Sequence, residues 1–337
     1  MRHMLFTILA TVAPMTGFAE QDPRIAHIVQ DHILPRFETL ADASDALANS
    51  ARADCTATSD ALRAAYFDAF DAWVSASHLR FGPTEIENRA FALAFWPDSR
   101  GATPKGLRQI ISARDPVAMS ASDYQEVSIA ARGFYALEYL LFDEGIRALG
   151  DETYRCTLTQ TITADIAVMS HAIKDDWRTD YAAQLLSPSG DEHYRSDDEA
   201  LQELLKALSA GLQFTGDTRI GRPLGSFTKP RPKRAEAWRS GRSARHVALS
   251  LQSLNELSRM LAGTDEELSR KLGEEFTRAS TQLTDLNDPV FASVTEPRGR
   301  LRLEVVQQSV GRIRTLVREA LGPALGVAAG FNSMDGD

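Results

Sequence analysis

The sequence predicts an all-α protein made of two antiparallel helical bundles. Apolar residues recur at spacings of three and four along most of the chain. Convincing two-residue alternation, the mark of a half-buried strand, is absent. Breaks rich in proline and glycine fall at 82–106, 187–196, 215–232 and 288–299. Long helices joined by short turns favour antiparallel bundles.

The expected helices can be placed in chain order by their apolar spacing and their end signals. The second begins at Ser59-Asp60 and ends at Gly82-Pro83, while Ser122 or Asp123 caps the third. Acidic residues after Asp265 suit the start of the seventh helix, because a helix N-terminus carries partial positive charge. The expected ranges are 25–50, 60–80, 123–142, 152–186, 197–213, 233–262, 265–287 and 298–321.

Length and charge limit the classes of function. The 337 residues carry 37 basic and 46 acidic side chains, a formal net charge of −9. Because phosphate contacts need a basic surface, the acidic balance argues against nucleic acid as a partner. The length and the long helix at 152–186 predict two domains of similar size, 20–170 and 171–337.

The first nineteen residues have the pattern of a secretory signal peptide. Arg2 and His3 precede an apolar run over 4–18, and the small residues Gly17 and Ala19 stand before a cleavage point after Ala19. The run is shorter than a membrane span, and no cysteine lies near the cleavage point. We therefore expect a periplasmic protein that is not a lipoprotein.

Export changes what the two cysteines imply. Cys55 and Cys156 are the only cysteines in the chain. An oxidising compartment favours a disulfide between them, and the alternative is two separate buried thiols. With no cysteine or histidine companion nearby, they do not make a zinc site.

Common enzyme signatures are missing from the sequence. None of the seven histidines has a glutamate three residues before or after it, which excludes His-Glu-x-x-His zinc sites and Glu-x-x-His di-iron pairs. Gly-x-Ser-x-Gly, Gly-x-Gly-x-x-Gly and phosphate-binding loop motifs are also absent.

Four segments together carry a family resemblance: LRFGPTEIENR at 79–89 followed by FWPD at 95–98, GFYALEYLLF at 133–142, RPKRAEAWRSGRS at 231–243, and GFNSMDGD at 330–337. From about residue 25 to its end, the chain resembles the imelysin family of exported bacterial proteins. The resemblance implies two helical-bundle domains with a site in the cleft between them. It also implies either metallopeptidase activity or a role in iron acquisition.

The chain departs from the family's Gly-x-His-x-x-Glu hallmark, because Tyr135 stands where the histidine is expected between Gly133 and Glu138. Losing this imidazole weakens the peptidase interpretation, so we do not expect enzymatic activity. Tyr135 and Glu138 share a helix face, and their hard oxygen donors suit Fe(III) better than zinc. They are therefore the candidate metal ligands, and close backbone approach would explain Gly133. The alternative is that Tyr135 packs in the core while Glu138 pairs with an arginine.

An unusually basic stretch at 219–246 holds nine lysines or arginines and one acid, Glu236. Within it, Arg239 and Ser240 are candidate contacts for an anion or a carboxylate, because the guanidinium fork suits such groups. The alternative is a helix face neutralised by the protein's own acids. Glu85 and Asn88 follow a Gly-Pro turn and are candidate ligand contacts or helix caps.

Three functional interpretations follow. The first is a periplasmic binding or accessory protein for iron uptake, which holds iron or an iron-containing ligand in the cleft and meets a membrane iron-transport component. The second is a metal-dependent peptidase of the imelysin type, and the third is an interaction protein without metal. A donor set of tyrosine and glutamate favours the first. We further predict that Tyr135 and Glu138 face Arg239 and Ser240 across the cleft.

Overall fold

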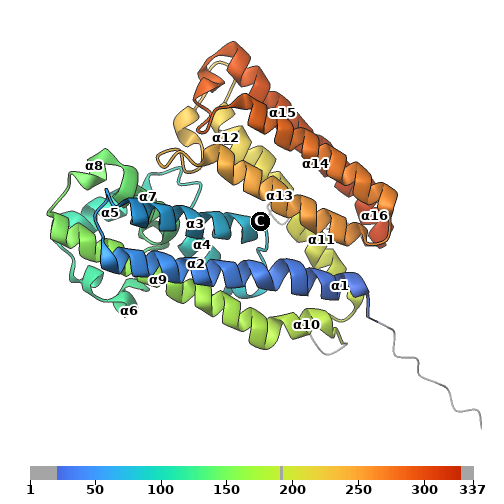
Figure 1. Ribbon diagram of the computed structural model, residues 1–337, viewed down its shortest axis with the longest axis horizontal. Coiled ribbons are helices and arrows are strands. Elements are labelled where there is room, and N and C mark those ends of the chain that lie inside the picture. The colour runs from blue at the N-terminus through green and yellow to red at the C-terminus, as the bar shows by residue number, and fades with distance from the viewer. Residues whose placement is uncertain (1–20, 190–192, 328–337) are drawn as a thin grey trace, which may run out of the picture.

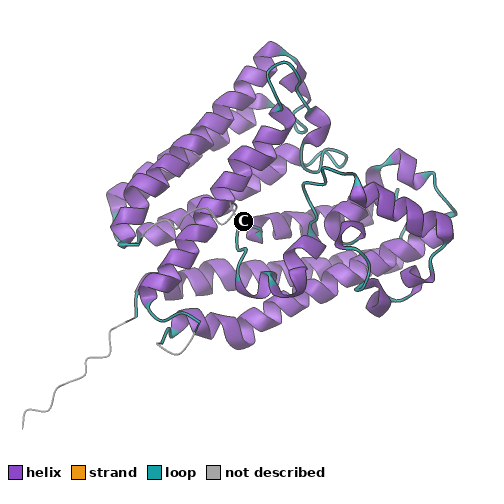
Figure 2. Ribbon diagram, turned by 180° about the vertical axis from the view of Figure 1, so that it is seen from behind, coloured by secondary structure: helices purple, strands orange, loops and turns teal. Residues whose placement is uncertain are grey.

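The computed structural model describes residues 21–189 and 193–327, and within these ranges the fold is helical with no strand (Figure 2). The predicted signal peptide and the motif at 330–337 lie outside the described residues. Among the described residues, no helix combines the length and apolar character that a membrane span requires. The all-α prediction is confirmed.

The helices form two groups, which appear as the blue-to-green and the yellow-to-red parts of Figure 1. The first group contains α1 (Pro23–Ile28), α2 (Leu34–Ala53), α3 (Asp60–Ala76), α4 (Arg89–Leu93), α5 (Ala102–Ala113), α6 (Ala121–Tyr124), α7 (Gly133–Phe142), α8 (Glu144–Arg147), α9 (Glu152–Asp176) and α10 (Ala182–Leu186). The second contains α11 (Asp197–Gln213), α12 (Gly221–Leu224), α13 (Ser243–Ala262), α14 (Glu266–Leu286), α15 (Pro297–Leu316) and α16 (Gly322–Leu325).

Helix α14 shows how the sequence pattern produces these elements. Asp265 accepts a hydrogen bond from the Leu268 backbone amide (2.9 Å), which satisfies one of the free donors of the first turn. Residues at spacings of three and four then form one buried stripe: Leu268, Leu272, Phe276, Ala279, Leu283 and Leu286. This stripe packs against α13 and α15.

The two groups meet along α3 and α13, which lie side by side. The buried apolar residues of the described chain form one connected core that includes both groups. The division at residue 170 falls inside α9, which continues to Asp176 and packs along α2. The division into two domains stays a prediction.

Three expected elements differ from the observed ones. The helix expected at 123–142 is interrupted between Tyr124 and Gly133, and the break expected at 82–106 contains the start of α5. The helix expected from residue 233 begins only at Ser243. The residues before it form a short 3₁₀ turn and further turns in which Ala237 has a positive φ of 47°. Apolar spacing alone did not reveal these turns, because their backbone is set by contacts with the first helix group.

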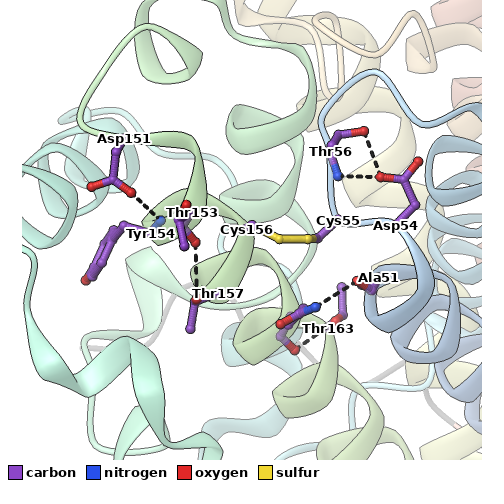
Figure 3. The surroundings of a disulfide bond; sticks show 11 residues. Ala51, Asp54, Cys55, Thr56, Asp151, Thr153, Tyr154, Cys156, Thr157 and Thr163 are labelled. Atoms are coloured by element: carbon purple, nitrogen blue, oxygen red, sulfur yellow. Dashed lines mark hydrogen bonds between the residues drawn. A yellow bond between two sulfur atoms is a disulfide. The ribbon is translucent and has the colours of Figure 1, made fainter.

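The structure pairs Cys55 with Cys156, as predicted (Figure 3). Cys55 follows the end of α2, and Cys156 lies in the first turns of α9. Their Cα atoms are 5.1 Å apart, a separation typical of disulfides. The bond joins positions 101 residues apart, so it links the segment after α2 to α9.

Gly133 begins α7 with a φ of +71°, and the expected close backbone approach is present. A Cβ atom here would lie 2.2 Å from the carbonyl oxygens of Ala92 and Leu93. We therefore expect Gly133→Ala to lower the free energy of unfolding by about 2 kcal/mol, measured by urea denaturation. Gly273→Ala in α14, where nothing lies within 4 Å, is the control and should be neutral or slightly stabilising. Equal effects of the two substitutions would contradict this account.

Candidate functional site

A cavity of about 500 Å³ opens where the two helix groups meet. We call it the cleft cavity. Its walls come from α3, the 80–97 segment, α7, the end of α11 with the π-helical turn Phe214–Ile220, and α13. The aromatic lining consists of Trp73, Phe91, Trp96, Tyr135 and Phe214, and the polar lining includes Ser77, His78, Arg219, Glu236 and Ser250. Cavities of this size and mixed lining are typical of small-molecule sites.

Tyr135 projects from α7 towards the second helix group, where its hydroxyl donates a hydrogen bond to Glu236 Oε1 (2.6 Å). The side chain is almost completely buried. Burial, with the Glu236 carboxylate beside it, holds the pKa of Tyr135 well above its ordinary value. The neutral phenol is therefore the form present near pH 7, rather than the phenolate that binds iron.

Glu236 is the centre of a buried network that the site prediction missed. Arg219 donates from Nε to Glu236 Oε2 (2.6 Å), and its remaining donors reach Ser250 Oγ (2.5 Å) and Ser77 Oγ (3.2 Å). His246 Nδ1 lies 3.2 Å from the same carboxylate. Although burial alone would raise the pKa of Glu236, Arg219 and His246 hold it well below its ordinary value. The signal in the sequence was the single acid inside the basic stretch.

Glu138 lies one turn beyond Tyr135 on α7 and contacts the predicted partner. Its Oε1 accepts hydrogen bonds from the Ser240 backbone amide (3.0 Å) and hydroxyl (2.8 Å). Burial raises the pKa of the Glu138 carboxyl, and the hydrogen bonds from Ser240 oppose that rise. Glu138 and Ser240 thus face each other across the junction of the helix groups.

Arg239 does not contact Glu138 by an ion pair. It donates from Nε to Asp143 Oδ2 (2.8 Å), and its guanidinium lies 3.9 Å from the centre of the Tyr139 ring. Asp143 also caps α8, so Arg239 fastens the turns before α13 to the end of α7.

The two loop candidates lie differently. Glu85 lines the cleft cavity and accepts a hydrogen bond from Arg80 Nε (2.6 Å). Asn88 precedes α4 in the left-handed region (φ 57°) and makes no capping hydrogen bond with its side chain. Asn88 is not among the residues lining the cavity. A contact between Asn88 and a ligand stays a prediction.

Metal ligation by Tyr135 and Glu138 stays a prediction. Within 21–189 and 193–327, no group of three or more histidine, cysteine, aspartate or glutamate side chains is arranged to hold a metal ion. Tyr135 and Glu138 are each engaged in hydrogen bonds with residues of the second helix group. A metal ion bound by either side chain would have to replace these hydrogen bonds.

Two histidines lie behind the cleft cavity. The Nε2 atoms of His32 and His78 are 2.8 Å apart in a buried contact, and His78 also lines the cavity. Burial lowers the pKa of His32 to about 4, although Glu256 beside it acts in the opposite direction. Burial likewise holds the pKa of His78 well below its ordinary value. Both rings are therefore neutral in the folded protein near pH 7.

This pair predicts a pH dependence of stability. In the unfolded chain both histidines take up protons near pH 6.5, whereas in the folded protein the pKa of His32 is about 4 and that of His78 is also well below its ordinary value. The unfolded state binds more protons in that window, so the free energy of unfolding should fall as the pH falls from 6.5 to 4. Urea denaturation of wild type and of His32→Gln/His78→Gln across this pH range measures the decline in the free energy of unfolding. The variant should show a shallower decline, and parallel curves would contradict the prediction.

The sequence profile of the imelysin family matches residues 33–317, most of the chain. The chain belongs to the imelysin family. Iron-regulated protein A of Synechococcus elongatus is 22% identical over 322 residues, which are 88% of this chain and 85% of that protein. This member therefore retains family similarity across nearly its whole length.

Two solved imelysin-like structures share the fold. One is an imelysin-like protein from Psychrobacter arcticum 273-4, with a TM-score of 0.78, 21% identity, and coverage of 92% of this chain and 96% of that chain. The other, from Parabacteroides distasonis ATCC 8503, is described as an iron-regulated protein A precursor. It has a TM-score of 0.74, 13% identity and the same coverage. These likenesses establish the imelysin fold.

Proposed function

We propose that this protein is an exported binding protein of bacterial iron uptake, which holds an iron-containing ligand in the cleft cavity. The observation that carries the proposal is the cavity itself, about 500 Å³ in volume and walled by both helix groups. A bare ion needs no such volume, whereas a chelate of organic groups does. The name of the cyanobacterial relative, Iron-regulated protein A, supports the link to iron.

The aromatic walls indicate how such a ligand is held. Trp73, Trp96 and Phe214 offer flat apolar surfaces, and Ser77 and Arg219 place polar groups beside them. Apolar burial supplies most of the affinity at sites of this kind, while the few polar groups set the orientation. The proposed polar residues are Tyr135 and Glu85, which line the cavity, together with Glu138, Asn88, Arg239 and Ser240, which do not line it.

Direct ligation of the metal is the finer version of the proposal. It requires Tyr135 to leave Glu236 and Glu138 to leave Ser240, since both are engaged in the structure. A ferric phenolate gives a visible charge-transfer band, so a band that appears with Fe(III) in wild type and is missing in Tyr135→Phe would assign the metal to Tyr135. If wild type retains iron but shows no band, the iron would be assigned to a bound chelate rather than to Tyr135.

Export to the periplasm is part of the same proposal. The signal-like segment at 1–19 and the Cys55–Cys156 disulfide support it, because disulfides persist in oxidising compartments. A membrane iron-transport component would then receive the ligand. Cell fractionation with an antibody against the protein tests the location, and recovery in the cytoplasm at full precursor length would contradict it.

The binding test blocks the cleft cavity from within. Ferric citrate and ferric catecholate are titrated into wild type, Thr218→Phe and Thr179→Phe, and bound iron is measured by equilibrium dialysis. Thr218 lines the cavity, so phenylalanine there narrows it and obstructs a bulky ligand, whereas Thr179 is exposed and outside the cavity. We expect wild type and Thr179→Phe to retain iron and Thr218→Phe to lose it. Absence of retention by wild type, or equal retention by all three, would reject the proposal.

A further inference from the structure

A second hollow, of about 130 Å³, shares Trp96 and Tyr135 with the cleft cavity but has different chemistry. Its walls come from the 95–103 segment, α7, α12 and the turns before α13. Four cationic side chains line it: Arg222, Lys233, Arg234 and Arg239. We call this hollow the basic groove.

Three of the four cations lack a carboxylate partner. Arg239 pairs with Asp143, but Arg222, Lys233 and Arg234 form no ion pair with any residue that the structure describes. The Nε donor of Arg222 is buried and finds no hydrogen-bond acceptor in the described part of the chain. A buried donor without an acceptor is costly, so a ligand atom that accepts this hydrogen bond would be stabilising.

The two carboxyl groups that line the groove, those of Asp98 and Glu138, are outnumbered by its four cations. Asp98 accepts hydrogen bonds from three backbone amides, those of Arg100, Ala102 and Thr103. Glu138 is buried and accepts both hydrogen bonds from Ser240. Partial burial and the neighbouring Arg234 cation lower the pKa of Arg222, which reflects crowding of like charges. The groove is thus electropositive in a chain whose formal net charge is −9.

Aromatic rings flank the cations. The Arg222 guanidinium lies 5.7 Å from the centre of the Trp96 ring, and the Lys233 ammonium lies 5.5 Å from that of Trp238. Cation–π contacts hold a charged side chain in place without neutralising it.

We propose that the basic groove is a binding site for a small multivalent anion of the carboxylate or phosphate class. Guanidinium forks match the planar oxygen pairs of these groups, and the volume limits the occupant to a small molecule. The exposed Lys233 and Arg234 attract the anion. The half-buried Arg222 then donates a hydrogen bond to the anion from its free Nε–H group. The site does not depend on iron or on the cleft cavity being occupied.

The test uses metal-free citrate and inorganic phosphate as probes, titrated by calorimetry into the full mature chain. The variant is Lys233→Gln/Arg234→Gln, two exposed side chains whose replacement leaves the core intact. The matched control is Lys229→Gln/Arg298→Gln, which removes the same charge from exposed positions outside the groove. Thr218→Phe, which narrows the cleft cavity, separates this site from the iron ligand site.

We expect saturable binding of at least one probe to wild type that weakens with added salt. Binding should weaken by more than about tenfold in Lys233→Gln/Arg234→Gln and by less than about twofold in the control. Thr218→Phe should bind the probe as wild type does. No saturable binding of either probe to wild type, equal weakening in variant and control, or loss in Thr218→Phe would overturn the proposal. If Thr218→Phe loses the ferric ligand but still binds the anion probe, the basic-groove proposal is supported.

Discussion

Replacing Glu236 with glutamine should lower the free energy of unfolding by about 3–5 kcal/mol. The substitution leaves the Arg219 guanidinium buried without a counter-charge, since the two side chains are each only 5% exposed and 2.6 Å apart. It also weakens the hydrogen bond that Tyr135 donates across the helix groups. Chemical denaturation at pH 7 measures the loss, because the depressed pKa of Glu236 keeps its contribution fully present there.

A double substitution separates the pair from general damage to the core. Glu236→Gln/Arg219→Met removes both charges, so it should recover part of the stability that Glu236→Gln loses. Asp217→Asn is the matched control, because Asp217 pairs with Arg314 at the surface (3.0 Å), where an ion pair is worth about 0–1 kcal/mol. If Glu236→Gln cost no more than Asp217→Asn, the buried network would not be what joins the helix groups.

Removing the disulfide should have a similarly large effect. In the chain-entropy model, a bond that closes a loop of about 100 residues stabilises by about 4–5 kcal/mol, chiefly by restricting the unfolded chain. We therefore expect Cys55→Ser/Cys156→Ser to unfold at a clearly lower urea concentration than wild type under non-reducing conditions, with a nearly native circular dichroism spectrum before the transition.

Reductant is the control for the disulfide prediction. It should lower the midpoint of wild type to that of the double variant and leave the variant unchanged. A variant midpoint equal to that of oxidised wild type would contradict the prediction that the disulfide stabilises the fold. Two titratable thiols in the oxidised wild-type protein would show that the bond does not form.

The buried charges and the basic groove have one physical origin. The stretch 219–246 carries nine cations, and the structure places them in different environments, including ion pairs of Arg242 and Arg245 with Asp71. Arg219 is drawn into the core by Glu236, Ser77 and Ser250, while Lys233 and Arg234 remain at the surface. The buried environment stabilises the junction of the helix groups, and the surface environment leaves positive charge available for a ligand.

The sequence predicted those parts of the fold that depend on local patterns. Apolar spacing placed α3, α11, α14 and α15 to within about five residues of their ends, because a helix buries one face and its apolar residues recur at a fixed spacing. The helix expected at 152–186 corresponds to the continuous run of α9, a π-helical turn and α10. Caps such as Ser59 and Asp265 are equally local. The Cys55–Cys156 pairing followed from there being only two cysteines. The resemblance led to the imelysin family through short motifs.

Other features required the tertiary structure, because they depend on partners distant in sequence. Tyr135 and Glu236 are 101 residues apart, and nothing in either segment shows that the phenol meets this carboxylate rather than a metal. The sequence predicts helix for the turns before α13. Docking against α7 instead sets their backbone and brings Ser240 to Glu138. When the two helix groups pack, each buried polar group needs a hydrogen-bond partner. Only this packing decides which polar groups are paired within the protein and which cations stay free.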